Sequence, residues 1–272
     1  MFTGLRATNS MGEGLDLPLG DYSSGYLVVD VDGLGPVKAA FTTTQLANTA
    51  GSQFRSSVRE SRNVVITLGL RPDFVASSGQ SLRDGLYRFF SPGEIVTLGV
   101  FMDGEILGQL VGRTETVDPE IFVKKPSVVI SVLCFDPDIV GAQVTTDTWA
   151  SHATTTRAVE YSGTVPTGFV LSSEVLTGAV SAIEIRNQSS LADTYFNFED
   201  SLLAGDVVRF STVKGSKYAK RSRDSVEKSV LYGVPASAVW GVLYPGLNTI
   251  RVKHTGTAFN YSLSYFPRYG GI

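Results

Sequence analysis

The sequence predicts a mainly β protein of two β-sandwich domains, the first of which carries a single helix. Its 272 residues are enough for one large or two ordinary domains. The first half contains one amphipathic stretch between two apolar strands, whereas the second half contains short alternating runs separated by turn residues. We place the boundary near Asp138, which divides the chain into residues 1–137 and 138–272.

The composition indicates a folded protein with a substantial core, because 43% of the residues are hydrophobic and only 18% are charged. A net charge of -3 is too small to predict a nucleic-acid partner or a membrane surface. The N-terminus lacks the basic start and apolar core of a signal peptide, and no apolar run approaches the roughly 20 residues of a transmembrane helix. We expect a protein made in a cytoplasm that neither recognises nucleic acid nor inserts into a membrane.

The first clear strand covers residues 26–31, and Asp32-Gly33 turns the chain after it. Asp30 and Asp32 lie on one face of this strand. Paired carboxylates can serve acid–base chemistry or bind calcium, but beside a glycine at a strand end they more often cap a turn. The following GLGPVK lacks the third glycine and the helix that dinucleotide binding requires.

Residues 42–61 differ from their surroundings, because they are polar, rich in threonine and serine, and contain few apolar side chains. Such a long polar stretch is uncommon inside a compact domain. We interpret it as an arm or long hairpin that leaves the domain body. A loop without regular structure is the alternative.

The helix of the first domain is predicted between apolar strands at residues 64–68 and 95–101. The first strand is nearly unbroken in its apolar character, which predicts burial on both faces. Ser81 is the expected N-cap, with Asp84 three residues later completing a capping box, and Ser91-Pro92-Gly93 ends the helix. One face collects the side chains that we expect to cover an open side of the sandwich, namely Leu82, Leu86, Phe89 and Phe90.

Two further patterns belong to the first domain. Asp103-Gly104 between apolar runs predicts a tight hairpin in which both residues have positive φ. Residues 127–134 form another strand, and its single cysteine, Cys134, shares a face with three aliphatic side chains. A lone cysteine excludes an internal disulfide, and this position predicts a buried, unreactive thiol.

The second domain shows no helical pattern. Short strands at this spacing are typical of a β-sandwich. We expect strands at residues 168–171, 179–186, 195–198, 207–212, 231–234, 239–244, 249–253 and 258–266.

The candidate chemical groups are few. His152 and His254 are far apart and lack ligand-spaced partners, so we expect surface histidines, no metal and no cofactor. No G-x-S-x-G motif is present, and we expect no enzyme. The basic residues 214–228 are interpreted as a solvated hairpin tip joining strands 207–212 and 231–234. Contact with an anionic neighbour is the alternative, through Lys217, Tyr218, Lys220, Arg221 and Arg223.

Several motifs, in this order, resemble the siphophage distal tail proteins, the Dit family. They are GLGPVKA, RNVVITLGL, LRDGLYRFFSPGEIVTL, the hairpin at Asp103-Gly104, LCFDPD, WGVLYPGLNTIRV and the terminal PRYGGI. The resemblance spans nearly the whole chain.

This resemblance implies a structural virion protein whose N-terminal sandwich closes into a hexameric ring at the distal end of a long non-contractile tail. The ring joins the tail tube protein to the tail-tip or hub protein, which is similar to tail-associated lysins. Tape-measure and receptor-binding proteins are further implied partners. The second domain resembles galectins and carbohydrate modules. The arm of such proteins clasps the next subunit, so the candidate contacts are Gln45, Leu46, Gln53, Phe54, Arg55 and Arg59.

Two other functions remain open from the residues alone. The β-sandwich pattern of the second half also suits a carbohydrate-binding module that contacts the host cell wall. A glycan-degrading enzyme would need two carboxylates about 5–10 Å apart in a cleft. The sequence places no such pair.

Overall fold

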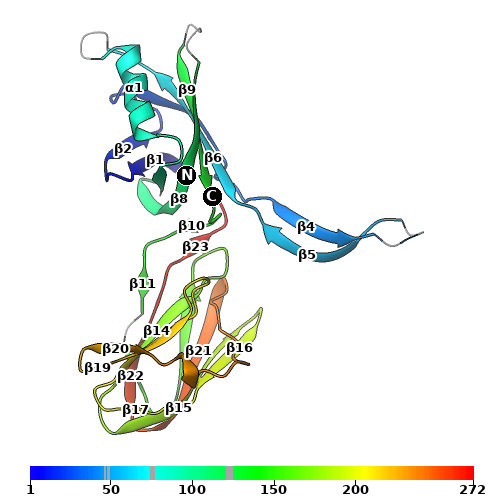
Figure 1. Ribbon diagram of the computed structural model, residues 1–272, viewed down its shortest axis with the longest axis vertical. Helices are drawn as coiled ribbons and strands as arrows, with labels where there is room; N and C mark the ends of the chain where they lie inside the picture. Colours follow the sequence, from blue (N-terminus) through cyan, green and yellow to red (C-terminus); the bar gives the residue numbers. More distant parts are fainter. Residues whose placement is uncertain (46, 48–49, 74–76, 121–124, 147) are drawn as a thin grey trace. The chain divides into compact units, whose positions relative to one another are not determined.

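The computed structural model describes residues 1–45, 47, 50–73, 77–120, 125–146 and 148–272. The chain is mainly β, as predicted, and divides into two compact units (Figure 1). The first unit is Met1–Gly141 with Tyr269–Ile272, and the second is Ala142–Arg268. The last four residues therefore return to the first unit, which no sequence pattern indicated.

In the described part of the first unit, hydrogen bonds join nine strands into one sheet beside a single core, and two further strands form a separate hairpin. Two strands precede the first one predicted. Leu5, Ala7 and Leu17 are buried in them, but small or polar neighbours interrupt the apolar pattern that would have predicted these strands. The path through the sheet is β2 (Gly14–Pro18), β1 (Phe2–Asn9), β7 (Ile95–Met102), β8 (Glu105–Glu120), β9 (Ser127–Cys134), β6 (Arg62–Leu70) and β3 (Tyr26–Asp32), with β10 (Ile139–Val140) and β23 (Arg268–Tyr269) attached beside it.

Strand β6 is buried on one face only. Val64, Ile66 and Leu68 are fully buried in the core, whereas Val65 and Thr67 between them are partly exposed. The predicted burial on both faces is therefore wrong for the single chain. The apolar run was not a sufficient signal, because Val65 is β-branched and suits either face of a strand.

Helix α1 (Gly79–Phe89) lies beside this sheet in Figure 1. Its N-cap is Ser78, whose hydroxyl accepts from Ser81 N at 3.1 Å while Ser81 Oγ accepts from Ser78 N at 2.9 Å. The predicted cap at Ser81 is wrong by one turn, since Ser81 occupies the answering position of the box. On the predicted face the residues Leu82, Leu86 and Phe90 are buried in the core, and Phe89 packs against it.

Two other predictions for the first unit are confirmed. Asp103 and Gly104 have φ of 51° and 86° in the turn between β7 and β8. Cys134 is fully buried, and this burial raises the pKa of its thiol to about 11. The cysteine is therefore a protonated core side chain at neutral pH.

The second unit is a sandwich of two sheets, and its core contains side chains from both. One sheet runs β11 (Val144–Thr145), β22 (Phe259–Tyr265), β14 (Phe169–Val175), β18 (Val207–Ser211), β19 (Tyr218–Arg223) and β20 (Val226–Ser229), with β12 (Trp149–Ser151) beside β22. The other runs β13 (Thr154–Tyr161), β21 (Gly246–Gly256), β15 (Ala179–Ser189) and β16 (Asp193–Phe198), with β17 (Leu202–Leu203) beside β15.

Two predicted strands of this unit are wrong. The segment predicted as strand 231–234 contains a 3-10 helix, η1 (Leu231–Gly233). The segment 239–244 makes one isolated bridge, between Leu243 and Thr167. Each segment contributes an apolar side chain to the core, since Leu243 is buried there and Val234 packs against it, and packing of single side chains needs no continuous ladder.

Candidate assembly interface

An isolated hairpin extends the chain between β3 and β6. Strands β4 (Ala39–Thr44) and β5 (Gln53–Arg59) pair only with each other, from Ala39 opposite Arg59 to Thr44 opposite Gln53. Figure 1 shows them as a separate ribbon beside the nine-stranded sheet. We call residues 39–59 the arm. Regular pairing in this segment agrees with the predicted hairpin, which begins three residues earlier than expected.

The arm exposes apolar side chains on strands that have no core beneath them. Phe41, Phe54 and Val58 are 67%, 60% and 69% exposed. The rings of Phe41 and Phe54 meet edge to face at 6.2 Å between centroids. A two-stranded hairpin is marginal in water on its own, and exposed aromatic residues mark interaction surfaces. The arm therefore has the properties of a segment that another surface covers.

The charge of the arm has one sign. Residues 39–59 contain two arginines, Arg55 and Arg59, and no aspartate or glutamate. Arg55 is exposed near the middle of β5, where its Nε donates to Thr44 Oγ1 at 3.0 Å. Arg55 thus gives the exposed part of the arm a positive charge, whereas Arg59 is paired with Asp138 of its own chain.

The predicted contact residues of the arm lie in different places. Gln45, Gln53, Phe54 and Arg55 are exposed on the arm, and Leu46 lies outside the described residues. Arg59 stands at the base, where its guanidinium forms a two-pronged ion pair with the buried carboxylate of Asp138. Arg59 thus anchors the arm to its own chain.

A buried arginine that no sequence pattern revealed lies three residues after Arg59. Arg62 is 1% exposed and donates only to backbone carbonyls. Burial lowers the pKa of this guanidinium from its usual range, and the nearby Asp138 carboxylate partly opposes that shift. In the sequence, an arginine at the start of an apolar strand looks like a residue exposed to solvent at the strand end. The apolar pattern therefore could not predict that Arg62 is buried.

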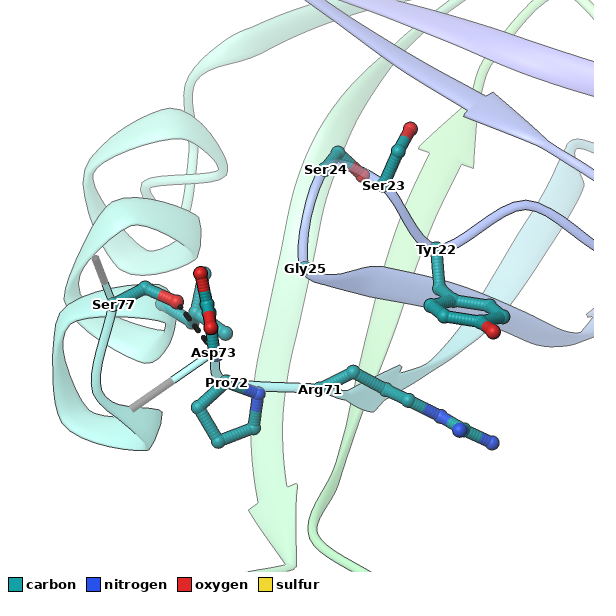
Figure 2. Close-up of a pocket in the computed structure, with 9 residues that line it drawn as sticks. Tyr22, Ser23, Ser24, Gly25, Arg71, Pro72, Asp73 and Ser77 are labelled. Carbon is teal, nitrogen blue, oxygen red and sulfur yellow. Dashed lines mark hydrogen bonds between the residues drawn. The ribbon is translucent and has the colours of Figure 1, made fainter. Parts of the chain in front are cut away.

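A cavity of about 540 Å³ opens between the loop before β3, the end of β6 and the start of α1 (Figure 2). The Arg71 guanidinium lies over the Tyr22 ring at 4.9 Å. Figure 2 shows these two side chains extending away from Asp73 and Ser77. Among the described lining residues, Asp73 is the one carboxylate, and none is a histidine or a cysteine.

The basic segment of the second unit forms strands β19 and β20, so its interpretation as a hairpin tip is wrong. The turn lies at Asp224-Ser225, where both residues have positive φ. No apolar alternation marked these strands, because Ala219, a small residue, occupies a buried position among basic ones.

The charges of this segment are largely matched within the unit. Arg223 donates from Nε and Nη2 to the two carboxylate oxygens of Asp206, each at 2.6 Å. This bond lowers the pKa of the fully buried Asp206. Lys220 binds Glu227 at 2.7 Å, and Lys217 lies over the Trp240 ring at 5.9 Å. The remaining candidates, Tyr218 and Arg221, are partly buried.

The two histidines occupy different environments. His152 is exposed, as predicted, but His254 is only 4% exposed, so its prediction as a surface residue is wrong. The Nε2 atom of His254 accepts from Ala153 N at 3.1 Å, and the ring packs edge to face on Phe259. Burial lowers the pKa of this imidazole, which the structure therefore holds neutral.

His254 should make the stability of the second unit depend on pH. Its folded-state pKa lies below the unfolded value of about 6.5, so the unfolded chain binds more protons just below that pH. The free energy of unfolding should fall as the pH drops through this range. We expect His254→Gln to reduce this dependence in urea unfolding at pH 7 and pH 5. A His152→Gln control should keep the dependence. An equal change in the free energy of unfolding between pH 7 and pH 5 in all three proteins would contradict the role of His254.

The described residues contain no group of three histidine, cysteine, aspartate or glutamate side chains placed to hold a metal ion. Within the same residues, no helix combines the length and apolarity needed to cross a membrane.

Comparison with solved structures identifies the architecture. The SPP1 Dit protein, described as a paradigm of the hub adsorption apparatus in phages infecting Gram-positive bacteria, aligns with a TM-score of 0.71. The alignment covers 97% of this chain and 98% of that protein at 14% identity. The chain has the Dit fold.

A second Dit-sized match lies in the phage P2 baseplate in its activated conformation, with a TM-score of 0.44 and 8% identity over 97% of this chain and 98% of that one. That similarity is too low to add to the argument. No protein-family profile and no curated protein sequence matches this chain. The structure thus shows the Dit fold at 14% identity, where neither the profile comparison nor the sequence comparison gives a match.

Proposed function

We propose that this chain is a non-enzymatic subunit of a phage tail tip, where copies close into a ring that joins the tail tube protein to the hub protein. The observation that carries the proposal is the Dit fold over the full length of both proteins. We place the protein in the virion after synthesis in the host cytoplasm. Tape-measure and receptor-binding proteins are its further proposed partners.

The arm supports a ring because it supplies a head-to-tail contact. Such a contact uses two different surfaces of each subunit, so it closes when its rotation permits. The arm has exposed aromatic residues, no acidic residue and no core of its own. A hairpin that becomes stable only against a neighbour would leave free subunits soluble until assembly begins.

Electron microscopy of the purified protein tests this function. We expect six-fold rings with a central channel at high protein concentration. Native mass spectrometry should give a main assembly of six chains. Monomers at every concentration, both alone and with a tail tube protein, would contradict the ring.

A second candidate function is carbohydrate binding by the second unit. Strand pairing places Tyr195, Arg186 and Arg251 in one row on the outer face of its sheet, and Tyr195 is 55% exposed. Aromatic and guanidinium groups side by side can hold a sugar ring and its hydroxyls. Retention of the full chain on cell-wall polysaccharide, lost in Tyr195→Ala, would favour this role, and no retention would remove it.

A further inference from the structure

The arm base, which we define as residues 33–38 and 59–62, is tied to the C-terminus by the buried side chain of Arg62. Its Nε donates to Pro137 O at 2.7 Å, and its Nη1 donates to Gly33 O at 2.5 Å and Gly35 O at 2.7 Å. Its Nη2 donates to Gly270 O at 2.7 Å. One side chain thus joins both ends of the arm to the segment before Asp138 and to the end of the chain.

Water cannot readily replace the backbone carbonyls that accept hydrogen bonds from Arg62. Arg62 is 1% exposed, so an N–H group that loses its carbonyl there stays buried without a partner. An unpaired buried donor on a charged group costs more than the net value of the bond itself. Arg62 should therefore keep its position beside the arm only while the carbonyl of Gly270 accepts its hydrogen bond.

The last residues also pack on the chain that leads into β4. Ile272 N donates to Leu34 O at 3.1 Å. Gly271 lies so close to this segment that an added Cβ would be 2.6 Å from Gly35 C and from Pro36 N. Residues 269–272 are thus a structural part of the arm base, although they lie more than 200 positions after it in the sequence.

We propose that residues 269–272 act as an assembly check, in which only a chain with these residues docked holds the arm base and can offer an ordered arm to a neighbour. Chains in which they are missing or undocked would keep most of the first core but would lose the ordered arm. The assembly step of this inference rests on the proposed ring function. The docking step does not.

Hydrogen exchange on the full chain and on a chain ending at Tyr269 tests the docking step in dilute monomer. We expect amides of residues 33–44 and 53–62 to exchange about tenfold faster in the shortened chain, since the base loses two hydrogen bonds and the packing of Gly271. Amides of β14 and β22 in the second unit should be unchanged. Gly271→Val is a second variant, because it blocks docking and removes no residue.

Arg62→Met should give the same faster exchange. The matched control is Arg113→Met, since Arg113 is an exposed arginine of the same sheet that donates to Gly93 O at 2.6 Å. Native mass spectrometry should show about tenfold less assembly for the shortened chain and for Gly271→Val. The control should assemble as the unmodified chain does.

Unchanged exchange at the arm base in both C-terminal variants would overturn the proposal. Normal assembly despite faster exchange would also overturn it, because the check would then have no effect. If the intact chain forms no ring, the proposed function fails, and the exchange result still decides whether the C-terminus holds the arm base.

Discussion

Leu86→Asp is expected to unfold the first unit and leave the second unit folded. Leu86 is 1% exposed and belongs to the core of the first unit, whereas the second unit has a separate core. The substitution removes an aliphatic side chain from the core and places a carboxylate there without a partner. A loss of about 5 kcal/mol or more would match the whole stability of many domains. Near-UV circular dichroism and urea unfolding should show one remaining transition.

The neighbouring Tyr87 provides the control. It is 37% exposed on the same helix, so Tyr87→Asp should lower the free energy of unfolding by no more than about 1 kcal/mol. A Leu86→Asp protein that unfolds in the same urea range as the unmodified chain would show that α1 does not pack on the sheet as described.

Replacing Phe41 and Phe54 together by serine is expected to abolish assembly without unfolding the monomer. Both rings are more than half exposed, at 67% and 60%, and contact each other outside the two cores. Aromatic residues at the centre of an interface contribute about 2 kcal/mol or more each, so the double variant should associate about 1,000-fold more weakly. Light scattering and native mass spectrometry measure the change, and thermal unfolding of dilute monomer checks the fold.

A matched pair of exposed apolar residues outside the arm separates this effect from a general loss of surface hydrophobicity. Met11 and Leu191 are each 67% exposed, like Phe41. Met11→Ser with Leu191→Ser should assemble normally. Rings of normal size and abundance from the Phe41→Ser, Phe54→Ser chain would exclude the arm as the contact between subunits.

The helix shows how far local patterns reach. The spacing of Leu82 and Leu86 predicted the face that the structure buries, because helical geometry repeats every 3.6 residues wherever the helix lies. The first residue of the helix was harder to predict. Ser78 and Ser81 are both suitable caps, and the answering partner in the box is a serine in place of the usual glutamate. The choice depends on where the chain enters from the preceding strand.

The basic strand shows where such patterns end. Lys220, Arg221 and Arg223 are mixed with the small residues Ala219 and Ser222, a composition that suits a solvated turn and a strand equally well. Strand β19 forms because it pairs with β18 and because Arg223 forms an ion pair with the buried carboxylate of Asp206. Neither partner is visible in the spacing of the segment itself. The residues 231–244 were misassigned for the related reason that core packing and strand pairing both select apolar side chains.

The sequence by itself determined the properties that depend on near neighbours: the mainly β class, the buried face of α1, the turn at Asp103-Gly104 and the hairpin of the arm. The tertiary structure alone decided that Arg62 is buried and that Gly270, which is 208 positions away, accepts one of its hydrogen bonds. Spacing along a chain reports periodicity over a few residues. A buried guanidinium needs carbonyl groups that the whole fold brings together, and no local pattern encodes their meeting.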